Sequence, residues 1–451
     1  MAPLAPGDAV ASNNPYNGGT HLPDITVISP VFVAGEPAPL FYVASRGHHA
    51  DVGGITPGSM PPFSCSIDQE GLLLDQVPLI RQGVLDRQAW LVRLAAGPTP
   101  VRNPEQLLAD LQAQVAANQL GVQELQRLVQ RQGLAEVRAY MAHGQAQGAA
   151  AVRRLIDQLQ DGCHRLERDD GSCLAVQVRV DRQQRRLSLD FHGTSPQQPG
   201  NANAPLAITR AVVLYVMRCL TTEAIPLNDG CFEPIDLHVP EGSLLHPRPP
   251  AAVVAGNVET SQALADLLLG ALGVQAGSQG TMNNLSFGDG DRQYYETIGG
   301  GSGAGCTVAL GGFAGASAVQ CHMTNSSLTD PELLEDRYPV RLWRFSRRHG
   351  SGGTGRWPGG DGVVRELEVL APLTVALLSS CRRVAPAGLA GGADGCTGRN
   401  SVQRAGGAWE PLPGNVALEL QPGDRLRIET PGGGGYGAAE APFRPPAQRE
   451  R

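Results

Sequence analysis

The sequence predicts an α+β protein with mixed sheets, a helical insertion and a glycine-rich C-terminal region that contains short strands. Three observations predict this class. Residues 1–100 hold β-branched and aromatic runs separated by Gly and Pro turns. Residues 103–160 carry apolar side chains at helical spacing. The last third of the chain is rich in glycine, which accounts for 57 of the 451 residues.

We expect four regions along the chain. They are an N-terminal β-rich region with a metal site (1–100), a helical segment (101–162), an α/β central region (163–300) and a glycine-rich, β-containing C-terminal region (301–451).

Individual elements follow from local patterns. The runs 25–33 and 40–44 flank Gly35-Glu36-Pro37 and predict a β-hairpin. Asn103-Pro104 is typical of a helix start, and Gly133 interrupts the apolar stripe that follows, so two or three helices are expected before residue 160. The remaining predictions are an antiparallel strand pair within 173–191, helices at 206–220 and 260–272 (the latter capped by Thr260 or Ser261), and short strands at LTVALLS and RLRIET.

Composition excludes several classes of function. The net charge is −7 and no basic patch occurs, so nucleic acid is not an expected partner. No apolar run approaches the about 20 residues of a membrane span, and the N-terminus does not resemble a secretory signal. Nine scattered cysteines without a Cys-x-x-Cys motif predict reduced thiols and a cytoplasmic location.

Lysine is absent, and all 36 basic side chains are arginine. The chain therefore has neither the phosphate-binding lysine of a P-loop nor a Schiff-base lysine.

The densest polar cluster spans NNPYNGGTHLPD (13–24) and RGHHAD (46–51). Pro23 forbids a helix interior, so His21 and Asp24 are expected in a turn. The predicted hairpin would return His48 or His49 to this pair. Imidazole and carboxylate ligands suit Mn, Fe or Zn. Alternatively, these side chains only cap turns; two clusters joined by one short hairpin favour the metal site.

The stretch GNVETSQ (256–262) is a second candidate. Asn257, Glu259 and Ser261 precede a predicted helix N-terminus, where free N–H groups bind anions. A plain helix cap is the favoured alternative.

Two further stretches, GTMNNLSFG (280–288) and YYETIGGGSGAG (294–305), combine Asn with Gly. They indicate either backbone close to a ligand or tight turns. Glu296 is a candidate general base if its surroundings raise its pKa. His322, in CHMTN, is a candidate catalytic residue or else a core histidine. WPGGDG (357–362) and TPGGGGYG (430–437) are expected to be structural turns.

The ordered motifs of the chain resemble those of the hydantoinase B/5-oxoprolinase C-terminal family, and most closely its bacterial 5-oxoprolinase-like branch. Related members are the acetone and acetophenone carboxylases. The matching stretches are NPYNGGTHLPD, GHHADVGGITPGSMPPFS, QEGLLL, GTSPQ, GNVETSQ, QGTMNNLSFG, YYETIGGG, HMTN, RYPVRL, GSGGTGRWPGGDGVVRE, GLAGG and TPGGGGYG.

The resemblance implies a hetero-oligomer with a hydantoinase A-type partner, which would bind ATP and Mg²⁺ and phosphorylate a small cyclic amide. The B-type chain would complete the reaction. Its implied metal ligands are His21, Asp24 and one of His48 and His49, with His49 slightly preferred. We expect catalytic roles for Glu296, His322 and Glu259, and substrate contacts from Asn257, Asn283, Asn284 and Arg46.

The implied reaction is hydrolysis of 5-oxo-L-proline to L-glutamate. Alternatives are hydrolysis of hydantoin or N-methylhydantoin, a ketone carboxylase component, or an inactive assembly component. The last alternative arises because the family's usual N-terminal stretch before the Pro-Gly-Asp turn is expected to be missing. Three further departures from the family pattern are Asn14, His192 and Gln320.

Overall fold

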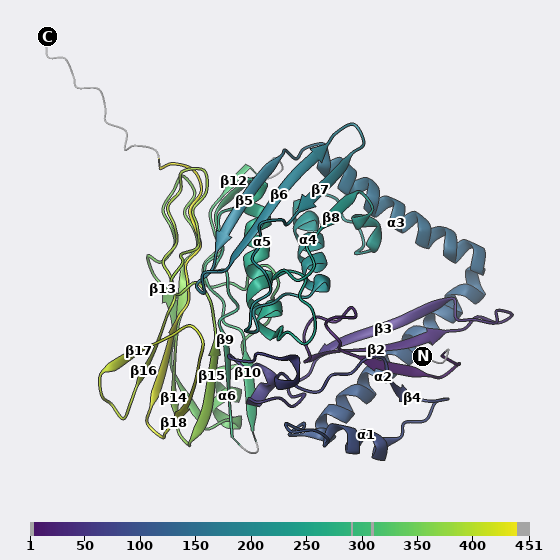
Figure 1. Ribbon diagram of the computed structural model, residues 1–451, viewed down its shortest axis with the longest axis horizontal. Coiled ribbons are helices and arrows are strands. Elements are labelled where there is room, and N and C mark those ends of the chain that lie inside the picture. Colours follow the sequence, from purple (N-terminus) through teal and green to yellow (C-terminus); the bar gives the residue numbers. More distant parts are fainter. Residues whose placement is uncertain (1–3, 290–291, 308–310, 440–451) are drawn as a thin grey trace, which may run out of the picture.

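The computed structural model describes residues 4–289, 292–307 and 311–439, and its helices and mixed sheets confirm the α+β class (Figure 1). The N-terminal sheet has the order β3-β2-β1-β4. Its strands are β1 (Ala9–Ser12), β2 (Asp24–Val31), β3 (Phe41–His48) and β4 (Val77–Ile80).

The predicted hairpin is confirmed as the antiparallel pair β2–β3. β3 runs four residues beyond the predicted end at Ala44, and its register places His48 opposite Asp24. The extension matters because it carries the histidine pair back to the start of β2.

The helical segment consists of two long helices, α2 (Pro104–Gln132) and α3 (Leu134–Ile156), after the short α1 (Arg87–Leu94). Asn103 caps α2, and Gly133 separates the two helices with a φ of +86°, as the sequence predicted. α2 packs on β2 and β3, where the side-chain amides of Gln114 and Asn118 donate to strand carbonyls.

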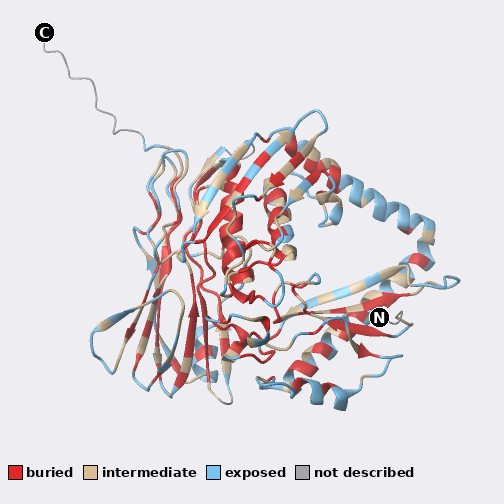
Figure 2. Ribbon diagram, viewed as in Figure 1, coloured by how far each residue is buried: buried red, intermediate tan, exposed pale blue. Residues whose placement is uncertain are grey.

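The central sheet, β5-β6-β7-β8, is covered by helices on one face (Figure 1). Its elements are β5 (Gly162–Glu167), β6 (Cys173–Asp181), β7 (Arg186–Asp190), β8 (Ile235–His238), α4 (Leu206–Leu220) and α5 (Ser261–Ala271). The predicted β6–β7 pair and the predicted α4 helix are confirmed. α5 is buried along almost its whole length (Figure 2), since it lies between this sheet and α4.

The start of α5 corrects one prediction. Gly256–Thr260 is itself a wide helical turn that runs directly into α5, and neither Thr260 nor Ser261 caps the helix with its side chain. Both hydroxyls donate instead to backbone carbonyls, of Ala202 and Asn257 respectively. The turn therefore does not present an anion-binding helix end at Ser261, because those N–H groups lie within a continuing helix.

The C-terminal region packs two sheets around one apolar core that includes Phe287, Val375, Leu367 and Ile428. One sheet has the order β10-β9-β15-β18 and the other β13-β14-β19-β16-β17. The strands are β9 (Asn284–Gly288), β10 (Gln293–Glu296), β13 (Val340–Arg348), β14 (Gly362–Val369), β15 (Leu373–Leu378), β16 (Arg399–Gln403), β17 (Trp409–Leu412), β18 (Val416–Leu420) and β19 (Arg425–Glu429), with β11 (Gly305–Thr307) and β12 (Gly311–Phe313) as a separate pair and α6 (Pro331–Arg337) preceding β13.

The glycine-rich stretches pack backbone against backbone. Gly360 N–H donates to Ser302, and Gly433 N–H donates to Gly360. A Cβ on Gly360 would lie 1.9 Å from the carbonyl oxygen of Ala316, so only glycine fits there. The close partner of Gly360 and Gly433 is therefore neighbouring backbone, in keeping with the structural turns expected for WPGGDG and TPGGGGYG.

Candidate active site and metal centre

His21 lies in the predicted turn before β2. The Asp24 N–H donates to the His21 carbonyl (3.1 Å), and the His49 N–H donates to the Pro23 carbonyl (2.9 Å), which fastens the end of β3 to the turn. A side chain at Gly19 would lie 2.5 Å from the Asn13 carbonyl oxygen, so this approach also requires glycine. The hairpin thus brings the His21 and His48 rings to a centroid distance of 5.1 Å.

His21 and Asp24 form the centre of the site. His21 Nδ1 lies 3.3 Å from Asp24 Oδ2, is completely buried, and makes no hydrogen bond. Thr20 donates to the same carboxylate oxygen at 2.7 Å. Burial raises the pKa of Asp24, but the combined effect of His21, His48 and Thr20 is larger and in the opposite direction. The pKa of Asp24 therefore lies below its ordinary value, and the group is ionised at neutral pH.

These two atoms fit a metal ion. Ligand atoms bound to a Zn²⁺-type ion at about 2.1 Å lie about 3.4 Å apart in tetrahedral geometry. The His21–Asp24 distance matches this spacing, and the buried His21 Nδ1 has no hydrogen bond to give up on binding an ion. The donor set of imidazole and carboxylate suits a divalent transition metal.

His48 lies beside this pair. Its ring stacks on Tyr295, with centroids 5.4 Å apart and planes 9° from parallel. Part of the His48 residue is open to solvent, but its ring is surrounded by protein groups that displace water. This loss of water around the ring, together with the nearby His21, lowers the pKa of His48 to about 4. The ring is therefore neutral at pH 7 and has a nitrogen lone pair to offer. To share an ion with His21 and Asp24 it must turn about its side-chain bonds, because the three sets of ligand atoms do not all lie within 4.8 Å.

His49 points to the other face of the sheet. Adjacent residues of a strand alternate between faces, and His49 Nε2 pairs with Gln114 Oε1 of α2 at 3.1 Å. The His48 ring, rather than the His49 ring that the sequence slightly favoured, thus lies beside His21 and Asp24.

Asn257 belongs to the same site, although 236 residues separate it from His21. Its Nδ2 lies 3.4 Å from His21 Nε2. The wide turn that holds Asn257 is anchored by Glu70, whose carboxylate accepts hydrogen bonds from the N–H groups of Val253 and Val254. Burial raises the pKa of Glu70 to about 7.

A hydrogen-bonded chain leads into the core from Tyr295, the residue that stacks on His48. The Tyr295 hydroxyl donates to Asn284 Oδ1 (2.8 Å), and the Asn284 amide donates to Glu259 Oε1 (2.8 Å). Burial raises the pKa of Glu259 to about 7. Asn284 and Glu259, predicted from separate motifs, therefore lie together beside the histidine cluster.

Four other predicted residues lie elsewhere or play visible structural parts. Glu296 is buried and accepts two hydrogen bonds from Arg365, at 2.6 and 2.9 Å, so both carboxylate oxygens are engaged and the expected free base is not found. His322 pairs with Asp266 of α5 (2.9 Å). Asn283 binds Gln279 and Arg382 in the core. Arg46 is on the same strand face as His48 but is exposed, with its guanidinium on Thr26 and the Gly18 carbonyl.

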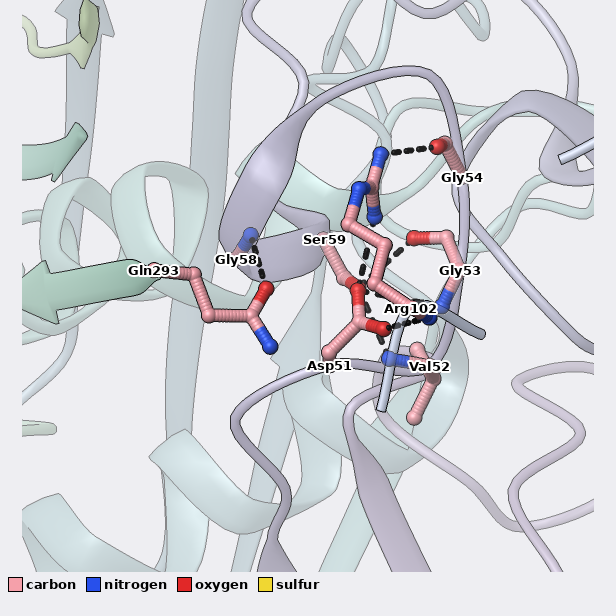
Figure 3. Close-up of polar contacts among 8 residues, drawn as sticks. All are labelled: Asp51, Val52, Gly53, Gly54, Gly58, Ser59, Arg102 and Gln293. Atoms are coloured by element: carbon pink, nitrogen blue, oxygen red, sulfur yellow. Dashed lines mark hydrogen bonds and ion pairs between the residues drawn. The ribbon is translucent and has the colours of Figure 1, made fainter. Parts of the chain in front are cut away.

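Asp51, the last acid of the RGHHAD motif, holds the surrounding loop (Figure 3). Its Oδ1 binds the Arg102 guanidinium at 2.7 Å, and the Ser59 hydroxyl also donates to it at 3.3 Å. The Gly58 N–H donates to Gln293 of β10 (3.2 Å), which docks this loop against the strand that carries Tyr295.

Tyr295 and Glu70 were missed. In the strand YYETIG, side chains alternate, so Tyr295 and Glu296 face opposite ways. The sequence pointed to Glu296 as a candidate base, whereas Tyr295 is the residue of this strand that faces the site. Strand alternation was the available signal, but it does not tell which face meets the histidines. Glu70 lies in the family motif QEGLLL, and no other feature of the sequence distinguished it as a site residue.

Among the described residues, no helix is long and apolar enough to cross a membrane. Residues 1–439 match the family model described as hydantoinase B/oxoprolinase. The chain is 45% identical over 460 aligned residues to 5-oxoprolinase 1 of Arabidopsis thaliana, with 96% of this chain and 36% of that protein covered. It is 30% identical to a putative B-type component of a D-/L-hydantoinase of Pseudomonas sp., covering 96% of this chain and 76% of that protein.

The fold is similar to that of the ATP-dependent caprolactamase from Pseudomonas jessenii (TM-score 0.84, 27% identity, 96% of this chain and 78% of that chain). It is also similar in fold to acetone carboxylase (TM-score 0.81, 18% identity, 96% and 65% covered). The chain spans about a third of the length of the 5-oxoprolinases it matches, which are eukaryotic, so the expected closeness to the bacterial branch stays a prediction. The chain belongs to the hydantoinase B/oxoprolinase family.

Proposed function

We propose that this chain is the B-type component of an ATP-dependent enzyme that opens a cyclic amide, with 5-oxo-L-proline hydrolysed to L-glutamate. One observation carries the proposal: His21, Asp24 and His48 lie in one place with Asn257 and with the Tyr295–Asn284–Glu259 chain. The 5-oxoprolinase relatives favour this substrate class.

The division of labour is the one that the family resemblance implies. We assign ATP and Mg²⁺ to a hydantoinase A-type partner, and the absence of lysine from this chain fits that assignment. Phosphorylation of the amide oxygen there makes a poor electrophile reactive, and this chain then receives the activated ring.

The residues of the site have separate tasks in this proposal. His21, Asp24 and His48 would hold a divalent metal (Mn, Zn or Fe), which when bound polarises a carbonyl and acidifies water. Asn257 orients the His21 ring. Glu259 fixes Asn284, whose amide oxygen accepts the hydrogen bond from the Tyr295 hydroxyl and so holds the Tyr295 ring against His48. Glu259, with a pKa of about 7, is poised to hold or release a proton near neutral pH.

Hydantoin hydrolysis is the second candidate, favoured by the relative named as a hydantoinase component. A ketone carboxylase has only a shared fold in its favour at 18% identity.

The test is to purify the chain with an A-type partner and measure ADP and ring-opened product. The arms are 5-oxo-L-proline, hydantoin, N-methylhydantoin, and acetone with bicarbonate. We expect ATP-dependent glutamate release, lost in His21→Ala and Asp24→Asn and kept in the surface control His143→Ala. Undiminished release in the first two variants rejects the metal role. Product from another arm alone reassigns the substrate, and no turnover in any arm favours an assembly component.

A further inference from the structure

A second group of metal-ligating side chains lies on the surface, at the ends of β7 and β8. Asp190 is the last residue of β7 and His238 is the last residue of β8. The parallel register of the two strands places these residues directly opposite each other. His192 follows two residues after Asp190. Among the described residues, this is the one trio of His, Cys, Asp or Glu whose ligand atoms all lie within 4.8 Å of one another.

The trio is already assembled. His192 Nδ1 lies 2.7 Å from Asp190 Oδ1, and the His192 N–H donates to the same oxygen at 3.0 Å. The His192 and His238 rings stack with centroids 4.8 Å apart and planes 16° from parallel. The Phe191 N–H donates to the His238 carbonyl at 3.0 Å, which fixes the two strand ends relative to each other. The ligand atoms of the three side chains therefore lie within 4.8 Å of one another on two strand ends that are tied together.

The cluster is also open to solvent. The Asp190 and His192 side chains are 42% and 65% exposed. A free ion can therefore reach all three donors without any opening of the fold.

We propose that Asp190, His192 and His238 form a surface site for a divalent transition-metal ion such as Zn²⁺ or Ni²⁺. Two imidazoles and one carboxylate are a donor set typical of such ions, and three ligands leave coordination positions open to water. The bound ion links the edge strand β8 to β7. It is separate from the His21 centre, and it has a practical consequence, because metal bound by the whole chain is the sum of two sites.

The test uses the full chain, stripped with a chelator and titrated with Zn²⁺ alone at buffered free concentrations. Bound zinc per chain is measured after equilibrium dialysis, and hydrogen exchange is followed at residues 235–238. The variants are His192→Ala, His238→Ala and Asp190→Asn, with His143→Ala as the control for loss of an exposed histidine. Each is made in the wild-type chain and in the His21→Ala/Asp24→Asn background.

We expect each of the three variants to weaken zinc binding at this site by at least about 10-fold. In the His21→Ala/Asp24→Asn background, the chain should still bind one zinc per chain, and this ion should slow exchange in β8. This double variant tests the surface zinc site separately from the proposed function, because a chain that cannot bind metal at the His21 centre still has the surface site intact. Zinc binding by His192→Ala and His238→Ala equal to that of His143→Ala overturns the proposal, as does binding without any added protection of β8. His192→Ser serves as a second variant if an alanine variant does not fold.

Discussion

Asn257 Nδ2 and His21 Nε2 lie 3.4 Å apart, which joins the wide turn before α5 to the turn before β2. A half-turn of the Asn257 amide exchanges its Nδ2 and Oδ1, so either end of this amide can face the imidazole. When Nδ1 of His21 binds a metal, Nε2 carries the proton and donates to its neighbour. The amide oxygen of Asn257 is then the acceptor.

Removing this acceptor should weaken the metal site. We expect Asn257→Ala to lower metal affinity by about 10- to 100-fold, the usual loss for a group that orients a ligating histidine, and Asn257→Asp to restore much of it. Chelator competition measures the affinity. Asn17→Ala, in the exposed loop before the turn, is the control, and equal affinity in Asn257→Ala and Asn17→Ala would contradict the assignment.

The two adjacent histidines should behave differently. His48→Ala should abolish metal binding at the His21 centre. His49→Ala should keep the metal and cost about 1–3 kcal/mol of unfolding free energy, because it removes a buried side chain and the partner of the Gln114 amide. Metal content and thermal unfolding of the two variants distinguish these outcomes. Loss of the metal in His49→Ala with retention in His48→Ala would instead identify His49 as the third metal ligand.

Tyr295→Phe keeps the ring that stacks on His48 but removes the hydroxyl that donates to Asn284. We expect unchanged metal content and a fall in kcat of about 10-fold or more, if the hydroxyl takes part in the proposed reaction. Steady-state kinetics with the A-type partner measures the effect, and Tyr42→Phe on the exposed side of β3 is the matched control. Normal kcat would leave Tyr295 with a packing role alone.

Sequence periodicity predicted much of the fold. Gly133 and the apolar stripe gave the helix break, and the runs around Gly35 gave the hairpin that returns His48 to Asp24. The choice between His48 and His49 could not be made, because it depends on which face of β3 receives α2. That contact is made by Gln114, 65 positions away from His49, and no local pattern records it.

The same reason explains Glu296 and Glu259. Both are buried acids in polar motifs, and their sequences look equally suited to proton transfer. Arg365, 69 residues from Glu296, decides that one of them is an ion-pair partner. Long-range pairing of this kind is invisible to spacing arguments, whereas the turn at Pro23 is local and was predicted.

Glu296 and Arg365 should contribute to stability rather than to catalysis. Because the pair is buried, removing one partner leaves an uncompensated polar or charged group, which costs about 3–5 kcal/mol. We therefore expect Glu296→Gln and Arg365→Met each to lower the thermal unfolding temperature, and the double variant to lower it by less than the sum of both. Additive losses would show that the two side chains act independently.

Glu70 should make stability depend on pH. Burial raises the pKa of Glu70 in the folded chain to about 7, above the ordinary value of 4.5, and the amides of Val253 and Val254 offset only part of this effect. Between these two pH values the folded state holds a proton that the unfolded state has released. The stabilisation that comes from protonated Glu70 is therefore fully present below pH 4.5 and is lost as the pH rises through 7.

Glu70→Gln replaces the ionising group with a neutral amide of similar shape. The unfolding free energy of wild type minus that of Glu70→Gln should fall by roughly 3 kcal/mol between pH 4.5 and pH 8, since each pKa unit corresponds to about 1.4 kcal/mol. Denaturant unfolding at several pH values measures this difference, with the exposed Glu36→Gln as control. A difference that stays constant with pH would mean that the backbone amides hold Glu70 ionised throughout, and that the anchor of the Asn257 turn is a permanent charge.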